Sequence, residues 1–204
     1  MIIAGIESSC DETSVGIVKN KQIIANLVAT QEEIHSPFGG VVPEFASRAH
    51  LEKLVPLFNR CLKKAQISAF QIDAFGVVNR PGLKGALMIG VSFTEGIGYA
   101  MKKPVYNVDH LYAHIAACYT DPYIQFPALG LVISGGHTSL FFIDNYTDLS
   151  ILGKTRDDAC GEVFDKVGRM MNLPFPGGMY VEKIAQKGNE KKIKFPHTHI
   201  KDSL

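Results

Sequence analysis

Alternating and clustered apolar residues divide the first part of the chain into strands and helices. Short apolar runs and period-two alternation predict five strands, at 2–6, 14–18, 22–29, 72–78 and 105–108. Apolar residues at helical spacing predict three helices, at 43–65, 85–100 and 110–119. The first three strands form a predicted meander, and the Gly- and Ala-rich helix at 85–100 is suited to close packing on a sheet.

The same order of elements then begins again. Strands are expected at 128–134, 139–143 and 151–155, and helices at 158–173 and 180–187. We therefore expect an α/β protein of two tandem lobes with a cleft between them, divided within 121–127 into domains 1–123 and 124–204. The later elements of the first lobe have no counterpart in the second, so this lobe is either minimal or incomplete.

Composition and charge narrow the class of protein. The 204 residues are 46% hydrophobic and 20% charged, which is sufficient for a packed core. The formal net charge of +1 excludes binding to nucleic acid by bulk charge alone. The N-terminus lacks a signal peptide and no long apolar run is present, so we expect a cytoplasmic protein without a membrane span.

Four scattered cysteines without a CxxC spacing predict reduced, mostly buried thiols, namely Cys10, Cys61, Cys118 and Cys160.

Two histidines four residues apart are the first candidate for chemistry. His110 and His114 share one face of the predicted helix, and Asp109 stands at its N-cap. Two imidazoles on one face can bind one Zn or Fe ion, although structural histidines with internal partners remain the alternative. Leu111 occupies the position of the glutamate base in zinc proteases, which argues against a protease.

An acidic turn and a glycine-rich turn are the next candidates. Glu7, Asp11 and Glu12 can face the cleft and hold Mg²⁺ through water or polarise a reacting group, or they form a solvated hairpin tip. The turn at 134–138 brings glycine N–H groups to a strand end, where they can approach phosphate oxygens. An ordinary type I′ or II′ hairpin is the alternative for this turn.

The helix at 158–173 carries acids at spacings that predict a shared face. Asp158, Glu162 and Asp165 lie at i, i+4 and i+7, and Asp157 can cap the helix. Asp165 is placed to accept a ribose or substrate hydroxyl, unless this face is an exposed one with an Asp–Lys pair. The segment 176–178 is expected to end the helix with a close backbone approach.

Arg80 lies in a turn and can meet a phosphate or a carboxylate, or remain a surface residue.

In this order, the motifs resemble those of one family. ESSCDET, GGVVPEFASRAH, RPGL, HxxxH, SGGHT, DDAxGExFDK and PGG are similar to the tRNA threonylcarbamoyladenosine transferases, formerly called O-sialoglycoprotein endopeptidases. The resemblance runs from residue 2 to about residue 200. It implies the ASKHA fold of actin, Hsp70 and sugar kinases, with two RNase H-like lobes, the second of them incomplete here. It also implies transfer of threonylcarbamoyl from threonylcarbamoyl-AMP to the adenosine beside the anticodon of ANN-decoding tRNAs.

The resemblance assigns roles to individual residues. His110 and His114 match two ligands of one Fe²⁺ or Zn²⁺ per subunit, and Asp11 and Glu12 lie in the catalytic acidic turn, with Asp11 the better candidate for assisting the transfer. Substrate contacts are implied for Val132, Ile133, Ser134, Gly135, Gly136, Asp165 and Gly178. The implied partners are tRNA, an inactive paralogue and a small ATPase.

Two departures from the family pattern modify these expectations. Met179 replaces the usual proline after Gly-Gly, and the chain ends before the expected late aspartate that completes the metal site. We therefore expect a C-terminally truncated family member whose two-histidine site binds metal weakly. A non-catalytic scaffold subunit like the inactive paralogue is the alternative function, but such paralogues generally lack the HxxxH pair that is present here.

Overall fold

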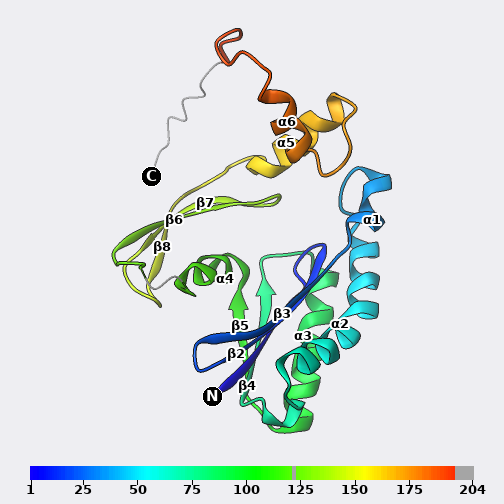
Figure 1. Cartoon of the computed structure of the whole chain (residues 1–204), viewed down its shortest axis with the longest axis vertical. Coiled ribbons are helices and arrows are strands. Elements are labelled where there is room, and N and C mark those ends of the chain that lie inside the picture. Colours follow the sequence, from blue (N-terminus) through cyan, green and yellow to red (C-terminus); the bar gives the residue numbers. More distant parts are fainter. Residues whose placement is uncertain (121–122, 196–204) are drawn as a thin grey trace.

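A computed structural model describes residues 1–120 and 123–195, and it contains two sheets (Figure 1). The first sheet has the strand order β3-β2-β1-β4-β5 and the second has the order β6-β7-β8. The strands are β1 (Ile2–Glu7), β2 (Glu12–Lys19), β3 (Gln22–Thr30), β4 (Ala74–Arg80), β5 (Val105–Asp109), β6 (Ala128–Ile133), β7 (Thr138–Ile143) and β8 (Leu149–Lys154). The α-helices are α1 (Glu32–His35), α2 (Pro43–Ala65), α3 (Lys84–Met101), α4 (His110–Ala117), α5 (Cys160–Met170) and α6 (Gly178–Ala185). Short 3₁₀ turns occupy Ser36–Phe38, Ala69–Gln71 and Cys118–Thr120.

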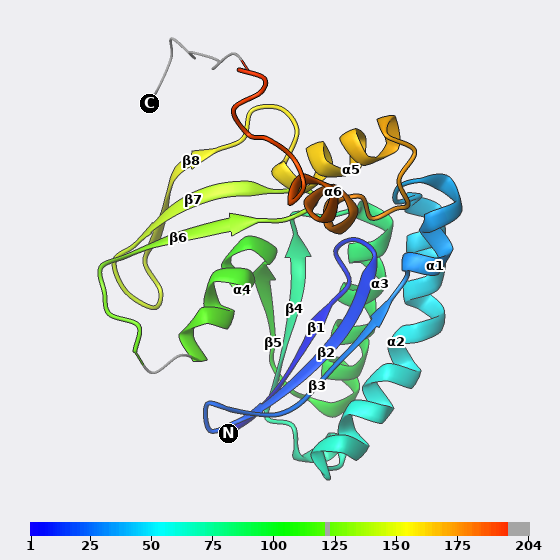
Figure 2. The same ribbon diagram turned by 45° about the horizontal axis from the view of Figure 1, so that its top comes forward.

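The first sheet is mixed. β1 pairs antiparallel with β2 and parallel with β4, and β4 pairs parallel with β5. Helices α2 and α3 cover one face of this sheet, and α4 lies on the other side, between the two sheets (Figure 2). The covered face holds the main core, in which Val15, Leu54, Phe58, Phe75 and Val77 are buried. The predicted strands and helices of this lobe are confirmed, with small shifts at their ends.

Only part of the predicted apolar stripe of α2 is buried. Leu54 and Phe58 pack in the core, whereas Phe45, Leu51 and Val55 are exposed. The buried face instead includes small and polar residues such as Ala46 and His50, because the start of the helix lies close to the turn after β1. The apolar residues on the flank of the helix remain in contact with solvent.

Glycines in α3 allow the close packing that the sequence predicts. A Cβ at Gly90 would collide with the hydroxyl of Ser8, and one at Gly98 would collide with Val105. The helix can therefore lie against β1 and β5 only because these positions carry no side chain.

The second sheet is an antiparallel meander whose inner face packs on α4. Ile115 of α4 joins Val132, Phe141 and Ile143 in a small core. Gly130 permits this contact, because a Cβ there would lie 2.6 Å from the Cδ1 of Ile115. The helix that carries the histidine pair is thus held between the two sheets.

A pair of short helices follows the second sheet. α5 and the start of α6 pack closely where Gly168 meets Gly177. A Cβ built on Gly168 would lie only 3.0 Å from the Cα of Gly177, so this packing leaves no room for a side chain. The pair also reaches the first lobe, because the Arg169 side chain donates to the Gly39 carbonyl and the Ser36 hydroxyl donates to the Phe175 carbonyl over 3.1 Å. α5 is shorter than predicted at both ends.

Three further expectations meet the structure here. The prediction of mostly buried thiols is wrong: all four cysteines are free, but only Cys61 is buried, while Cys10 and Cys118 are exposed. Residues 121 and 122 of the predicted lobe boundary lie outside the described residues. The two sheets fall on either side of the division into 1–123 and 124–204, which stays a prediction. None of the helices in the described ranges is long and apolar enough to cross a membrane.

Candidate functional site

The site begins at one edge of the first sheet. β1, β4 and β5 are parallel, so their C-terminal ends meet at the same edge, and β1 ends at Glu7 while β5 ends at Asp109. The Asp109 carboxylate accepts from the N–H of Leu111 over 3.0 Å and from that of Tyr112 over 3.4 Å, which confirms the predicted cap of α4. Arg80 pairs with the same aspartate, at 3.4 Å from Nε to Oδ2, and therefore meets a carboxylate.

The cap directs the first turn of α4 so that its two histidines converge. The Nε2 atoms of His110 and His114 lie 3.1 Å apart, and the ring centroids lie 4.4 Å apart. His110 is fixed from its other nitrogen, because Nδ1 lies 2.9 Å from Oε2 of Glu7 and 3.2 Å from the Ser9 hydroxyl. Both predicted metal-ligand residues thus share one face and present the same ring atom to one point.

Two properties of this pair fit a metal ion. Bonds of about 2.1 Å from a metal to imidazole nitrogen can bridge two Nε2 atoms at the observed 3.1 Å separation. Burial and the neighbouring His110 and His137 lower the pKa of His114, which favours the neutral form that binds metal. No group of three His, Cys, Asp or Glu side chains that could hold a metal ion is present within the described residues, so the described part of the chain offers a metal no third ligand beside this pair.

Glu7 is held in its charged form. Burial acts to raise the pKa of its carboxyl, but hydrogen bonds from His110 and Ser9 outweigh this effect and leave the pKa below its ordinary value. A carboxylate therefore faces the imidazole of His110 near neutral pH.

The glycine turn lies beside the histidines. It joins β6 to β7, and its ends are tied by Ser134, whose N–H donates to the His137 carbonyl over 2.8 Å. The His137 ring centroid lies 5.8 Å from that of His110. Two motifs with 19 residues of sequence between them, 115–133, thus meet across the space between the sheets.

The conformation of this turn is not the one that its glycines suggest. A type I′ turn needs a left-handed φ at both central residues, and a type II′ turn needs one at the first. Neither Gly135 nor Gly136 has such a φ, so the prediction of a type I′ or II′ turn is wrong. A Cβ built on either glycine meets no atom within 4 Å. Neither a left-handed backbone nor internal packing therefore requires glycine here, and the exposed backbone of the turn is open to an approaching ligand.

The start of α5 supports the glycine turn. The Gly161 N–H donates to the Ser134 carbonyl over 3.1 Å, and the Cys160 N–H donates to the Thr138 hydroxyl over 2.9 Å. A Cβ at Gly161 would lie 2.7 Å from the Ser134 carbonyl oxygen. The predicted cap by Asp157 is wrong, because the N-cap is Ala159 and the Thr138 side chain replaces a cap from the helix's own segment.

The acids around α5 do not share a face. Asp158 precedes the helix. The ammonium of Lys166 lies 2.7 Å from an Asp158 carboxylate oxygen and 3.1 Å from a Glu162 carboxylate oxygen. Asp165 instead accepts from the Gly177 N–H over 2.7 Å. The predicted common face is therefore wrong, because Asp158 lies outside the helical repeat, and the alternative of an exposed Asp–Lys pair holds for Asp158 and Glu162.

The segment 176–178 begins a helix instead of ending one. Gly177 is the N-cap of α6 and Gly178 its first residue, whereas α5 already ends at Met170. The close backbone approach exists, but it is internal: a Cβ on Gly177 would lie 2.9 Å from the Phe164 carbonyl oxygen.

The remaining predicted residues lie at different depths. Asp11 is half-buried in the turn after β1, and Glu12 is exposed at the start of β2. Cys10 is exposed as a residue, but its sulfur is partly desolvated, and this desolvation, with Asp11 adding to it, raises the pKa of the thiol to about 12. The side chain of Val132 is committed to the small core, whereas Ile133 is exposed.

The sequence does not connect Glu7 or His137 with the histidine pair, although the structure brings both to it. Its pattern predicts Glu7 as one of three carboxylates that hold Mg²⁺ or polarise a reacting group, and His137 as part of the glycine turn. The parallel order β1-β4-β5 contains the signal for Glu7, because it places the last residue of β1 near the start of α4. For His137, the sequence signal is a third imidazole directly after the two glycines of the turn.

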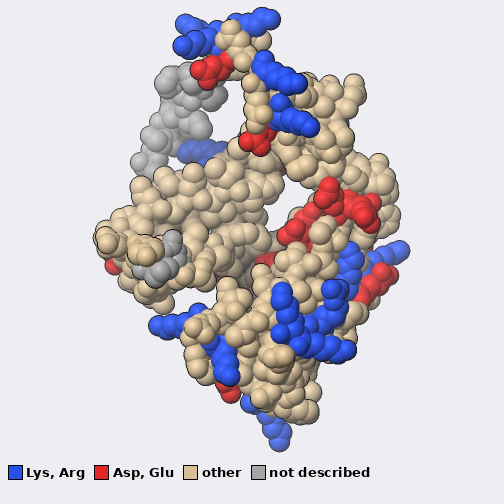
Figure 3. All heavy atoms as spheres, in the orientation of Figure 1, with Lys and Arg blue, Asp and Glu red and all other residues tan. Residues whose placement is uncertain are grey.

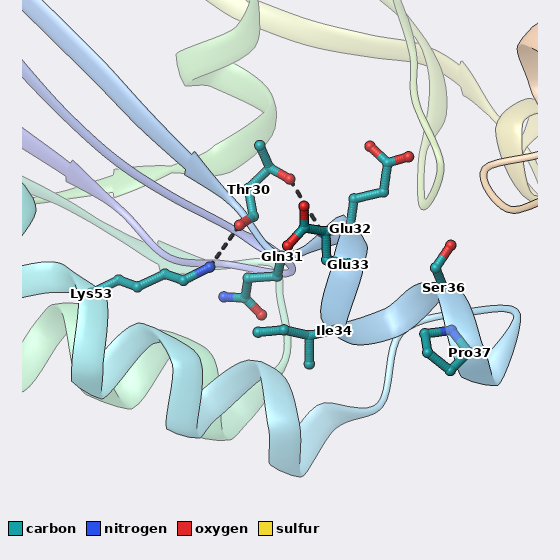
Figure 4. A pocket seen from close by; sticks show the side chains of 8 residues that line it. All are labelled: Thr30, Gln31, Glu32, Glu33, Ile34, Ser36, Pro37 and Lys53. Atoms are coloured by element: carbon teal, nitrogen blue, oxygen red, sulfur yellow. Dashed lines mark hydrogen bonds between the residues drawn. The ribbon is translucent and has the colours of Figure 1, made fainter.

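A separate groove of about 710 Å³ lies at α1. Figure 4 shows its lining, with the Lys53 ammonium donating to the Thr30 carbonyl over 2.7 Å. Acidic side chains gather near α1 at the rim of the opening between the two parts of the molecule in Figure 3. The groove shares no lining residue with the histidine pair or the glycine turn.

Comparison with solved structures defines the class of protein. YeaZ from Pseudomonas aeruginosa is similar over 76% of this chain and 66% of its own, with a TM-score of 0.52 and 16% identity. Component A of (R)-2-hydroxyglutaryl-CoA dehydratase from Acidaminococcus fermentans is similar over 93% of this chain and 70% of its own, with a TM-score of 0.51 and 13% identity. The fold is therefore of the ASKHA class, as expected.

Comparison with known sequences gives the family. The profile described as tRNA N6-adenosine threonylcarbamoyltransferase matches residues 22–204. Proteins of that name from Chlamydia muridarum and Syntrophomonas wolfei are each 48% identical over 201 residues. The chain belongs to the tRNA N6-adenosine threonylcarbamoyltransferase family. These matches cover 98% of the chain but 59% of each relative, so the chain spans well under two thirds of their length.

Proposed function

We propose that the protein catalyses threonylcarbamoyl transfer from threonylcarbamoyl-AMP to the adenosine beside the anticodon of ANN-decoding tRNAs, in the cytoplasm. Family membership supports the reaction class. The observation that carries the proposal is the meeting of the two Nε2 atoms, 3.1 Å apart, with the glycine turn whose His137 ring lies 5.8 Å from His110.

In this proposal His110 and His114 hold one Fe²⁺ or Zn²⁺ per subunit. Such an ion supplies Lewis acidity toward the carbonyl of an activated acyl donor. The protein's own contribution is to aim both imidazoles at one point, because Glu7 holds Nδ1 of His110, while burial lowers the pKa of His114 and favours its neutral form. A further ligand from outside the described residues is expected to complete the site.

The glycine turn is proposed to hold the adenylate. Gly135 and Gly136 are exposed residues that carry no Cβ, and backbone N–H groups of such a turn can donate to the phosphate of the AMP leaving group. Val132, Ile133 and Ser134 continue this segment; Val132 can contribute only through its backbone, because its side chain is in the core.

Two acidic sites are proposed to position the substrates. Asp11, half-buried at the edge that also carries Glu7, is the candidate for orienting the adenine amine, with Glu12 beside it. Asp165 accepts from the Gly177 N–H and so fixes the turn before Gly178, whose backbone is the proposed ribose contact. Because the exocyclic amine is a poor nucleophile, positioning is expected to supply much of the acceleration.

The partners proposed for this activity are tRNA, the inactive paralogue and the small ATPase subunit. The net charge of +1 supports a need for partners, because the chain alone offers little bulk attraction for the tRNA backbone.

Depletion of the gene product in its own cell tests the proposal. Nucleoside mass spectrometry of total tRNA should show loss of threonylcarbamoyladenosine on depletion, and its return when the intact gene is supplied. An unchanged amount of the modified nucleoside would contradict the proposal.

A second arm separates the enzyme from a scaffold subunit. The gene carrying His110→Ala should fail to restore the modification, while Glu52→Ala, on the exposed face of α2, should restore it. Restoration by His110→Ala would favour the non-catalytic scaffold.

A further inference from the structure

The contact between Glu7 and His110 joins the two ends of the first lobe's sequence. Glu7 is the last residue of β1, His110 opens α4, and 103 positions separate them. The distance of 2.9 Å from Oε2 to Nδ1 is that of a charge-assisted hydrogen bond. The other carboxylate oxygen, Oε1, accepts from the Ser9 N–H, so the carboxylate is held at both oxygens.

This arrangement determines which nitrogen of His110 carries the proton. The carboxylate can only accept, so the proton between the two groups belongs to Nδ1. In the neutral ring Nε2 then has a free lone pair, and this is the atom that lies 3.1 Å from Nε2 of His114. The Ser9 hydroxyl, 3.2 Å from Nδ1, can donate or accept and so cannot select a tautomer by itself.

We propose that Glu7 is a positioning residue that sets the tautomer and orientation of His110 and thereby raises the metal affinity of the histidine pair. This inference rests on the metal site of the proposed function. A carboxylate that accepts from the distal nitrogen of a ligating histidine fixes the ring and increases its basicity, and loss of such a partner typically costs 10- to 100-fold in metal affinity. Of the three carboxylates in the acidic turn, Glu7 is therefore the one that acts on the histidine pair, through its contact with His110.

The first measurement uses the metal-free protein. Long-range ¹H–¹⁵N NMR of the imidazoles should show His110 in the Nδ1–H form. Glu7→Ala should convert it to a mixture of tautomers. Glu7→Gln should keep the Nδ1–H form, because the amide oxygen still accepts from Nδ1. An Nε2–H form in the unaltered protein, or no change in Glu7→Ala, would overturn the proposal.

The second measurement is a Co²⁺ titration followed by visible absorption of the bound ion. The dissociation constant should rise 10- to 100-fold in Glu7→Ala and by a smaller factor in Glu7→Gln, which lacks the charge. Glu52→Ala, an exposed glutamate of α2, should bind Co²⁺ like the unaltered protein. Equal affinity of Glu7→Ala and the unaltered protein would overturn the proposal, and circular dichroism identifies any variant that fails to fold.

The two arms separate failure of the inference from failure of the proposed function. Absence of Co²⁺ binding in the unaltered protein would contradict the metal site itself, and the tautomer of His110 would still decide whether Glu7 sets it. If Glu7→Ala does not fold, Glu7→Gln decides: unchanged affinity for Co²⁺ would overturn the charge-dependent part of the proposal.

Discussion

Among single residues, four histidines in the described part of the chain differ in what their two ring nitrogens contact. His50 is fully buried, with Nε2 3.0 Å from the Cys10 carbonyl and Nδ1 2.8 Å from the Thr13 hydroxyl. His35 is also buried, between the Gln31 side chain and the Val42 N–H. Both nitrogens of these rings are used inside the fold. His110 and His114 instead turn Nε2 toward each other, and this difference is the reason we propose them, and not His35 or His50, as metal ligands.

The role of His50 can be tested by truncation. It ties the acidic turn to α2, so His50→Ala leaves a cavity and removes the partner of the buried Thr13 hydroxyl and of the part-buried Cys10 carbonyl. We expect a loss of about 2–4 kcal/mol in the free energy of unfolding. Urea denaturation measures it, with Arg48→Ala, an exposed neighbour on the same helix, as control. A loss no larger than that of the control would contradict the structural role.

The same two histidines predict a pH dependence of stability. Burial lowers the pKa of His35 and of His50, so the unfolded chain binds more protons than the folded one. The free energy of unfolding should therefore fall as the pH drops below about 6.5, by at most about 1.4 kcal/mol per pH unit for each histidine. Urea denaturation at pH 7.5 and 5.5 checks this, and the decrease should be smaller in His50→Gln. Equal or greater stability at pH 5.5 would contradict it.

Among the elements, the β6–β7 hairpin and the start of α5 form one unit. The turn contributes two exposed glycines that nothing in the structure requires, whereas Gly161 of α5 is required, because a Cβ there would collide with the Ser134 carbonyl. The two kinds of glycine serve different ends: the first leaves space open to a ligand, and the second permits packing.

This difference predicts opposite results for two alanine substitutions. Gly136→Ala should change the free energy of unfolding by less than about 0.5 kcal/mol but weaken binding of an adenylate. Gly161→Ala should destabilise the protein by about 1–3 kcal/mol because the backbone must shift. Urea denaturation and equilibrium binding of AMP to the purified protein give the two readouts. Strong destabilisation by Gly136→Ala, or AMP binding that it leaves unchanged, would refute this assignment.

In the molecule as a whole, one surface is unusually apolar. The outer face of the second sheet carries Leu129, Leu131 and Ile133, which are 67%, 61% and 57% exposed, and Phe142 lies beside Leu129 on the neighbouring strand. Contiguous exposed apolar area of this kind favours association. The chain spans 59% of the length of its relative from Chlamydia muridarum.

We therefore expect the 204-residue polypeptide to self-associate when purified. Light scattering after size exclusion should show a mass that increases with concentration. Leu131→Lys should reduce this association, because it places a charge in the centre of the face, and Phe70→Lys, at an exposed site on the first lobe, should not. A monomer at all concentrations would contradict the expectation.

The sequence predicted most elements because their signals are local. Alternation marked β2 and β3, helical spacing marked α2, and Asp109 before the HxxxH pair marked the start of α4. The predicted cap of α5 was wrong because Thr138, on another element, replaces the local cap. The predicted acidic face was wrong because the helix begins at Cys160, after Asp158. The contact between Glu7 and His110 was not predicted because 103 positions separate the two residues, and only the sheet order brings them together.

X-ray absorption of the protein loaded with Zn²⁺ or Fe²⁺ tests most directly whether His110 and His114 share one ion. The proposed metal site predicts one ion per chain with two imidazole nitrogens in its coordination shell, and loss of that signal in both His110→Ala and His114→Ala. An ion without imidazole ligands, or a spectrum unchanged in these two variants, would contradict it.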